Sequence, residues 1–365
     1  MKIVGGSVFG VDHKMHNVDL CFENGLITEE SRSGEFDASG CYVLPGLIDT
    51  HVHGAYGVEF YMSDDDLEPA LDFLSEHGVT SILASTPCAT VEELEHDIRR
   101  IVETKDERII GIHSEGPFIN PINMGGMHED RIQKPNVDTL NRLYEASQGM
   151  LKVMTMAPEL EGSEAVIDRC KELGIKISMG HSSATYECAK KAVARGASRM
   201  THTFNAMRAY NHREPGVLGY ALDDKRVHCE LICDLYHVSA PAIRLAVKMK
   251  GIENITMISD CSKFCGMGDG DYIVGDHTIY VRNGLCLLAN GTISGSSKCL
   301  SNGAKNMFEL GYQPEEIAVM AAVNPAKACE CTDRGELKVG YRADVVVFDK
   351  NFDIKAVFLG GERIK

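Results

Sequence analysis

The 365-residue sequence lacks the excess of basic residues that nucleic-acid-binding proteins carry. It contains 37 Lys and Arg residues against 53 Asp and Glu residues, which gives a formal net charge of −16 at pH 7. Binding to a nucleic acid needs a basic face, so no nucleic-acid partner is expected. A small anionic substrate remains compatible with this charge, because it needs only one or two local cations.

Long apolar runs, regular cysteine spacing and nucleotide-binding loops are also missing. No apolar run approaches the roughly 18 residues that cross a membrane, so no membrane partner is expected. The 13 cysteines form no CxxC pair, and Met1 leads into a strand-like segment instead of a secretory leader. This pattern predicts a reducing compartment, the cytoplasm. No G-x-G-x-x-G or P-loop follows a strand, so a nucleotide-binding fold has no support.

The middle of the chain repeats a strand and helix pattern about every 30 residues. Alternation of this kind predicts parallel βα units, and eight units in about 285 residues favour a closed barrel over an open sheet. The segment at 199–201 has the weakest pattern. The eight short apolar runs lie at residues 47–48, 79–83, 109–112, 153–156, 175–178, 199–201, 229–233 and 255–258.

The two ends of the chain read as short strands joined by turns. The Asn24-Gly25 pair is a hairpin signal, and residues 343–349 are rich in β-branched side chains. We therefore predict an α/β fold: a (β/α)8 TIM barrel with a small β-sandwich formed from both termini. The predicted bounds are 1–45 and 334–365 for the two parts of the sandwich, and 46–333 for the barrel.

Metal-capable side chains follow six of the predicted strands. In a parallel barrel the carboxyl ends of the strands meet on one face, where active sites lie. A single histidine is more often a surface or core residue than a ligand, but this joint pattern is much harder to dismiss. His51 and His53 are two residues apart on a strand and so point to one face. The other candidates are Glu115, His181, His202, Asp234, His237 and Asp260.

A mixture of imidazole and carboxylate groups indicates the kind of ion. Such ligands suit Zn²⁺, Fe²⁺ or Mn²⁺ better than Ca²⁺ or Mg²⁺. A catalytic metal keeps one position open for water, so three protein ligands suffice for one ion. The sequence therefore predicts a metal-dependent hydrolase with one or two ions per subunit.

These residues resemble the amidohydrolase superfamily, and the strings around them are similar to the N-acetylglucosamine-6-phosphate deacetylase family. The resemblance covers residues 45 to about 300, and the strand at 343–349 also fits. Ser114, Ser183 and Ser294 depart from residues that are common in the family, although none of them is a ligand position. The strings are Pro45-Gly46-Leu47-Ile48-Asp49-Thr50-His51-Val52-His53-Gly54, Gly111-Ile112-His113-Ser114-Glu115-Gly116-Pro117-Phe118, Gly180-His181-Ser182, His202-Thr203-Phe204-Asn205-Ala206-Met207, Arg213-Glu214-Pro215-Gly216 and Ser259-Asp260.

The resemblance implies a reaction, removal of the acetyl group from N-acetyl-D-glucosamine 6-phosphate in amino sugar catabolism. It implies that Glu115, His181 and His202 bind the main metal, and that His51 and His53 form a second position that only some members fill. Asp260 would be the general base and then the general acid.

The resemblance also implies the substrate contacts. His128 would polarise the acetyl carbonyl, and Asn205 and Ala206 would contact the sugar phosphate. Arg213 and His237 would hold the phosphate, with Arg213 supplied by the neighbouring subunit of a homodimer.

Three alternatives stay open at this point. A cyclic-amide hydrolase would need a carboxylated lysine at the end of the fourth strand, but Lys152 precedes that strand, which ends at Ala157. A deacetylase for the galactosamine epimer differs by one inverted hydroxyl, which a few loop contacts read. A catalytically inactive assembly protein would be expected to have lost a ligand or the base, and none is missing.

Overall fold

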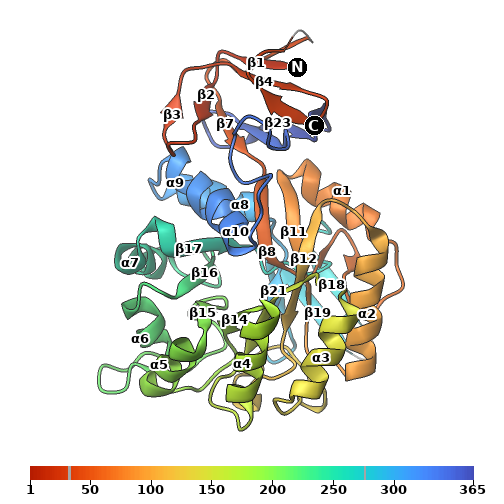
Figure 1. Ribbon diagram of the computed structural model, residues 1–365, viewed down its shortest axis with the longest axis vertical. Helices are drawn as coiled ribbons and strands as arrows, with labels where there is room; N and C mark the ends of the chain where they lie inside the picture. Colours follow the sequence, from red (N-terminus) through yellow and green to blue (C-terminus); the bar gives the residue numbers. More distant parts are fainter. Residues whose placement is uncertain (32–33, 275–276) are drawn as a thin grey trace.

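An eight-stranded parallel sheet forms the centre of the molecule (Figure 1). The computed structural model describes residues 1–31, 34–274 and 277–365. All eight predicted barrel strands are confirmed, including the weakest, and each pairs with its neighbour in sequence order. The strands are β8 (Leu47–Val52), β11 (Val79–Thr86), β12 (Ile109–Glu115), β13 (Leu151–Met156), β14 (Lys176–Met179), β15 (Ala197–Met200), β16 (His228–Ile232) and β17 (Ile255–Ile258).

The first and last strands close the barrel. Val52 and the segment just after β17 form a parallel bridge at Cys261. The Asp260 amide donates to the His51 carbonyl at 2.9 Å, and the His53 amide donates to the Cys261 carbonyl at 2.8 Å. The predicted fold class is therefore confirmed, and the closure brings His51, His53 and Asp260 to one seam.

Helices cover the outside of the barrel (Figure 1). In α2 (Val91–Thr104) a capping box formed by Thr90 and Glu93 satisfies the first turn, and Leu94, Ile98 and Ile101 bury one face at helical spacing. The remaining helices are α1 (Glu68–Glu76), α3 (Val137–Ala146), α4 (Ser163–Leu173), α5 (Tyr186–Arg195), α6 (Gly216–Asp223), α7 (Ala240–Lys250), α8 (Leu300–Glu309), α9 (Pro314–Ala318), the π-helical segment η4 (Val319–Val323) and α10 (Asn324–Ala328).

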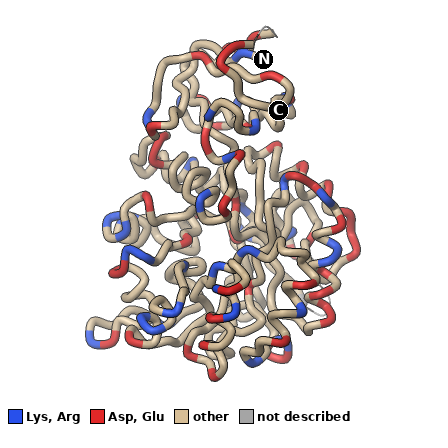
Figure 2. Tube along the Cα trace, viewed as in Figure 1, with Lys and Arg blue, Asp and Glu red and all other residues tan. Residues whose placement is uncertain are grey.

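Acidic and basic residues are interspersed along these outer helices (Figure 2). Arg142 on α3 contacts Glu92 and Glu95 on α2 at 3.0 and 2.8 Å. Exposed pairs of this kind contribute only about 0–1 kcal/mol each, so the helices are held mainly by their apolar faces. Among the described residues, no helix combines the length and the apolar character that crossing a bilayer requires.

Strands from both ends of the chain pair with one another. In a six-stranded sheet, β7 (Tyr42–Pro45) lies antiparallel to β22 (Val345–Phe348), with Val43 opposite Val347. The rings of Phe22 and Phe358 meet edge to face at 5.3 Å. Figure 1 shows both termini in this small β structure, above the barrel. The six-stranded sheet also contains β2 (Ser7–Phe9), β3 (Met15–His16), β23 (Ile354–Leu359) and β24 (Glu362–Arg363). A separate four-stranded sheet consists of β1 (Lys2–Val4), β4 (Leu20–Glu23), β5 (Leu26–Thr28) and β6 (Glu35–Asp37).

An antiparallel four-stranded sheet, which the sequence patterns did not predict, is inserted between β17 and α8. It consists of β18 (Gly270–Val274), β19 (His277–Arg282), β20 (Leu285–Leu287) and β21 (Ile293–Ser296). Ser296 on β21 donates its amide to the Asp260 carbonyl at 2.8 Å, and the Ser262 amide donates to the Ser296 carbonyl at 3.0 Å. The inserted sheet therefore holds the backbone that carries Asp260.

Candidate metal centre

Six side chains that the sequence predicted as metal-site residues converge at the carboxyl end of the barrel. They come from strands that lie on different sides of the barrel, and they fall into two groups whose ligand atoms lie within 4.8 Å of one another. The first group contains Glu115, His181 and His202, and the second contains His51, His53 and Asp260.

The first group is compact and buried. Glu115 Oε1 lies 3.1 Å from His181 Nε2 and 3.0 Å from His202 Nε2. The two imidazole nitrogens are themselves 3.0 Å apart. Two histidines thus turn the same ring nitrogen toward one carboxylate oxygen.

The second group is joined to the first through Glu115. His51 Nε2 and His53 Nε2 are 3.2 Å apart, and each lies 3.5 Å from Asp260 Oδ1. Glu115 Oε1 lies 3.3 Å from His51 Nε2, and Glu115 Oε2 lies 3.2 Å from His53 Nε2. The Glu115 carboxylate therefore faces both groups, a relation that the sequence did not reveal.

These distances fit a bound divalent cation. Nitrogen and oxygen ligands of tetrahedral Zn²⁺ lie about 2.0–2.2 Å from the ion, which places neighbouring ligand atoms about 3.3–3.5 Å apart. The separations within both groups are close to that value. Four imidazoles and two carboxylates can therefore hold one or two transition-metal ions.

Three of the six residues in the two groups have a left-handed backbone. The φ angles are +46° at His181, +26° at His202 and +50° at Asp260. Residues other than glycine rarely adopt such angles, and strained residues of this kind gather at functional sites. Each of the three lies two residues after the end of a barrel strand, so the turn that follows the strand directs the side chain toward the metal cluster.

A loop after β12 lies over His181. The His181 Nδ1 atom contacts the Asn123 carbonyl at 2.8 Å, so Nδ1–H donates and Nε2 presents its lone pair to Glu115. Two departures from the family pattern lie against this loop, because the Ser183 hydroxyl bonds Asn123 and Ser294 leaves no room for a side chain at Gly126. The serines therefore shape the segment that carries His128.

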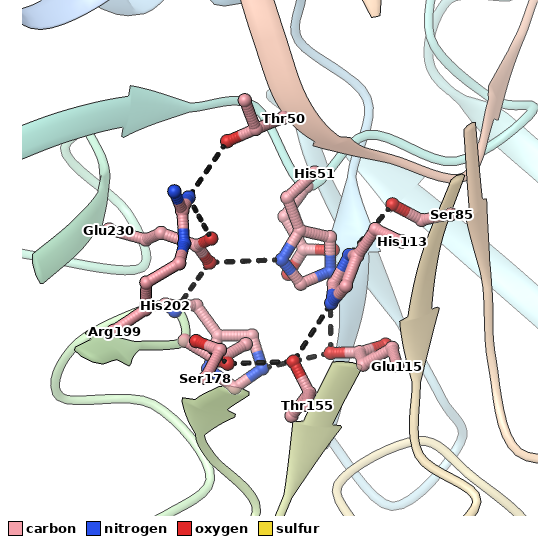
Figure 3. Close-up of polar contacts among 12 residues, drawn as sticks. Thr50, His51, Ser85, His113, Glu115, Thr155, Ser178, Arg199, His202 and Glu230 are labelled. Carbon is pink, nitrogen blue, oxygen red and sulfur yellow. Dashed lines mark hydrogen bonds and ion pairs between the residues drawn. The ribbon is translucent and has the colours of Figure 1, made fainter. Parts of the chain in front are cut away.

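Below the two groups, the barrel interior is polar (Figure 3). Arg199 and Glu230 form a buried ion pair at 2.9 Å. Burial would raise the pKa of Glu230, but the hydrogen bond with His51 and the charge of Arg199 outweigh it and lower that pKa below its usual range. Barrel interiors are commonly filled by Val, Ile and Leu, so this layer is a departure that sequence patterns missed.

His113 also belongs to this interior layer. Its Nδ1 lies 3.0 Å from the Ser85 hydroxyl and its Nε2 lies 2.8 Å from the Thr155 hydroxyl. Burial lowers the pKa of His113 well below the usual value of a histidine. His113 is therefore a neutral imidazole whose two ring nitrogens are both occupied by hydroxyl groups.

Comparison with known proteins agrees with this geometry. The Amidohydrolase family matches residues 42–364. The chain belongs to the amidohydrolase family. Lys152 lies at the start of β13, at the opposite end of the strand from the metal cluster, so this amidohydrolase has no lysine in the place that the cyclic-amide hydrolases use.

Two curated relatives of this amidohydrolase are similar over most of its length. The N-acetylglucosamine-6-phosphate deacetylase of Lysinibacillus sphaericus is 32% identical over 94% of this chain and 92% of its own. The N-acetylgalactosamine-6-phosphate deacetylase of Escherichia coli O157:H7 is 33% identical over 88% of this chain and 87% of its own.

A solved structure is also closely similar. It is a mutant N-acetyl-D-glucosamine-6-phosphate deacetylase from Mycobacterium smegmatis in complex with N-acetyl-D-glucosamine-6-phosphate. It superposes with a TM-score of 0.93 at 28% identity and covers 100% of this chain and 99% of its own. The resemblance to this family, inferred from the sequence motifs, is confirmed.

The predicted substrate residues of this amidohydrolase lie in the loops around the cluster. His237 is fixed by Asp234, whose carboxylate accepts from His237 Nδ1 at 2.6 Å and from the Tyr236 and His237 amides at 2.9 Å. Burial would lower the pKa of His237, but the hydrogen bond and charge of Asp234 outweigh it and raise that pKa above 6.5. The contact with Asp234 therefore favours the protonated form of the His237 side chain.

The other predicted substrate residues lie farther out. Asn205 and Ala206 follow His202, where the Asn205 amide side chain donates to the His202 carbonyl at 3.2 Å and Ala206 has a φ of +49°. His128 and Arg213 are exposed, and Arg213 contacts the His212 ring at 3.1 Å. Both side chains therefore lie at the surface of the single chain.

Proposed function

We propose that this amidohydrolase removes the acetyl group of N-acetyl-D-glucosamine 6-phosphate by hydrolysis and releases D-glucosamine 6-phosphate and acetate, in amino sugar catabolism. The observation that carries this proposal is the convergence of Glu115, His181 and His202 beside Asp260. Deacetylases of phosphorylated amino sugars that are similar over most of the chain support it.

The proposed metal ligands are those of the two groups. Glu115, His181 and His202 would hold the main ion, and His51 and His53 would take part in a second position. The donor set suits Zn²⁺ or Fe²⁺, with Mn²⁺ as a third choice, one or two ions per subunit. When bound, a divalent cation would supply Lewis acidity, which lowers the pKa of a water molecule toward neutral pH.

Asp260 is the proposed proton carrier. Its Oδ1 lies 3.5 Å from both His51 and His53, at the edge of the cluster, and its side chain keeps 14% exposure. It would take the proton of the attacking water and then deliver it to the departing nitrogen, because an expelled amide anion would be too basic. The carbon–oxygen bond forms, the carbon–nitrogen bond breaks, and acetate and the amine leave.

His128 and the phosphate residues complete the proposed site. Gly125, three residues before His128, approaches the His181 ring, so the loop of His128 can cover the cluster. We assign His128 to the acetyl carbonyl oxygen, where a donor stabilises the developing negative charge. Asn205, Ala206 and His237 would bind the sugar phosphate, and Arg213 of the neighbouring subunit in a homodimer would complete the phosphate site.

An assay of deacetylation tests the proposal. N-acetylglucosamine 6-phosphate, its galactosamine epimer and the two unphosphorylated sugars are offered to the same sample, whose metal content is measured. We expect turnover of the phosphorylated glucosamine substrate by protein that contains a transition metal. Hydrolysis of the free sugars at the same kcat/KM would contradict the phosphate site, and no hydrolysis of any of them would contradict the proposal.

The galactosamine epimer is a second candidate substrate. A relative that is named for it is 33% identical over 88% of the chain, so identity does not separate the two sugars. The same assay separates them, because it measures the hydrolysis of each sugar phosphate on its own.

Location in the cytoplasm depends on the cysteine pattern alone and stays a prediction, as do the domain bounds 1–45, 46–333 and 334–365.

Arg213→Ala is expected to weaken binding of the phosphorylated substrate. Arginine binds phosphate through two parallel hydrogen bonds, and a charged hydrogen bond contributes about 1.5–3 kcal/mol, so kcat/KM should fall about 10- to 100-fold, mainly through KM. Arg99→Ala, an exposed arginine on α2 that pairs with Glu95, is the control. An unchanged KM would contradict the role of Arg213.

Mixed dimers test which subunit supplies Arg213. Subunits that carry Arg213→Ala are combined with subunits that carry Asp260→Asn, each nearly inactive alone with dilute substrate. If Arg213 acts across the interface, one site of each mixed dimer has both residues intact and activity returns. Activity that stays at the sum of the two variants would place Arg213 in the site of its own subunit.

The affinity for the phosphorylated substrate is expected to fall as pH rises. The His237 cation is present below its raised pKa and is lost as pH passes upward through it, so KM should rise there. The substrate phosphate is already a dianion above its second pKa of about 6, so it adds no transition at higher pH. In Asp234→Asn the rise in KM should move to lower pH, and an unmoved profile would contradict this role.

A further inference from the structure

A buried arginine–glutamate pair lies directly beneath the metal cluster. Arg199 on β15 is 2% exposed and Glu230 on β16 is 1% exposed, and Arg199 Nη2 donates to Glu230 Oε1 at 2.9 Å. Both residue types are almost never fully buried unless they are paired. The pair lies inside the barrel, in a layer that is usually filled by apolar side chains. Packing alone therefore does not explain why charged residues occupy this position.

The pair contacts the backbone and side chains that carry the metal-site residues (Figure 3). Glu230 Oε2 lies 3.3 Å from His51 Nδ1 and accepts the His202 amide at 3.3 Å. Arg199 Nη2 also donates to the Thr50 hydroxyl at 3.2 Å, next to His51. The Arg199–Glu230 pair therefore connects β15 and β16 to β8, and it does so beside His51 and His202.

These contacts determine how His51 is presented. When Nδ1–H donates to Glu230, the lone pair of the ring is on Nε2, which faces Glu115 and Asp260. A carboxylate behind a metal-binding histidine fixes both the tautomer and the ring orientation. His53, the other imidazole of the second group, has a buried Nδ1 that makes no hydrogen bond with the described residues. Of the two imidazoles in this group, His51 is therefore the one whose Nδ1 contacts a carboxylate of the described residues.

We propose that Glu230, held in place by Arg199, is a positioning residue that orients His51 for a metal ion shared by His51, His53 and Asp260. The inference deepens the proposed function and rests on it only in taking these residues as metal ligands. Neither residue touches the substrate or the reacting atoms. Their effect is on how tightly the second ion is held.

A double variant separates positioning from simple stabilisation. Arg199→Met with Glu230→Leu replaces the ion pair by apolar side chains of similar size, a change that buried pairs often tolerate without loss of stability. The probe is Zn²⁺ alone, titrated against a chromophoric chelator into metal-free protein, with the melting temperature measured on the same samples. We expect a similar melting temperature of the metal-free protein, but binding of one of two ions about 10- to 100-fold weaker.

A second variant covers the case in which the double variant does not fold. Glu230→Gln keeps the shape of the side chain but replaces the carboxylate behind His51 by a neutral amide, and it should weaken the same ion in the same direction. Thr256→Val is the matched control, because Thr256 lies opposite Glu230 in the neighbouring strand β17 and its buried hydroxyl bonds none of the described residues. Its zinc affinities should equal those of the parent.

Two results would overturn the inference. One is parental affinity for both ions in Glu230→Gln and in a folded double variant, which would leave the pair a structural role only. The other is a parent chain that binds a single zinc ion, since nothing would then occupy the group that His51 serves. Failure of the proposed function looks different, because zinc binding that depends on Glu230 without hydrolysis of any amino sugar phosphate would reject the substrate and keep the positioning role.

Discussion

Asp260→Asn is expected to lower kcat by about 10²- to 10⁴-fold, the range that positioned proton transfer contributes. An amide cannot take the proton of water or return it to the leaving nitrogen. The fold should persist, because Asp260 has a φ of +50° and asparagine tolerates this left-handed region well. The main metal ion should persist as well, since its proposed ligands Glu115, His181 and His202 are untouched.

Three measurements check this result: kcat with saturating substrate, metal content and the melting temperature. Asp271→Asn, an exposed residue of the inserted sheet that pairs with Arg282, is a control for the chemical change itself. Turnover close to that of the parent would exclude Asp260 as the proton carrier. Loss of metal together with activity would instead make it chiefly a ligand.

Glu115→Gln is expected to remove both activity and tight metal binding. Its two carboxylate oxygens lie 3.0 to 3.3 Å from four imidazole nitrogens, so one substitution weakens both groups. Metal-ion catalysis supplies several kcal/mol of transition-state stabilisation, and each 1.36 kcal/mol is a factor of ten, so kcat/KM should fall about 10³-fold or more.

The rise in melting temperature on adding Zn²⁺ provides a second readout. A cation that binds only the folded state stabilises it by mass action, and this shift should nearly vanish in Glu115→Gln. Glu92→Gln, exposed on α2, should retain the parental shift and activity. A variant at Glu115 that keeps its zinc-dependent shift would exclude the carboxylate as a shared ligand.

Local patterns in the sequence were sufficient to predict the barrel. Short apolar runs and helical stretches alternate about every 30 residues along the chain. This alternation predicted all eight barrel strands, including β15 (Ala197–Met200). The rule that parallel strands end on one face then predicted that Glu115, His181, His202 and Asp260 lie together. The pairing of the two ends followed from strand patterns at both termini.

Other features depended on neighbours far apart in the chain. The strands of the inserted sheet, β18 to β21, are short and have no helices between them. The repeating strand and helix pattern that predicted the barrel therefore gave no signal for this sheet. Arg199 and Glu230 looked like ordinary charged residues, since nothing local shows that both side chains point into the barrel. The proposed phosphate contact of Arg213 would come from a second subunit, and no pattern within one chain tests that proposal.

The sequence by itself determined the kinds of residue at the end of each strand, and through them the metal chemistry. Only the tertiary structure decided that Glu115 faces both groups and that Glu230 stands behind His51, 179 residues away along the chain. The physical reason is that strand periodicity assigns each side chain to a face, whereas distances between faces arise when the barrel closes. Closure at Val52 and Cys261 brings the first and last strands into register and completes the cluster.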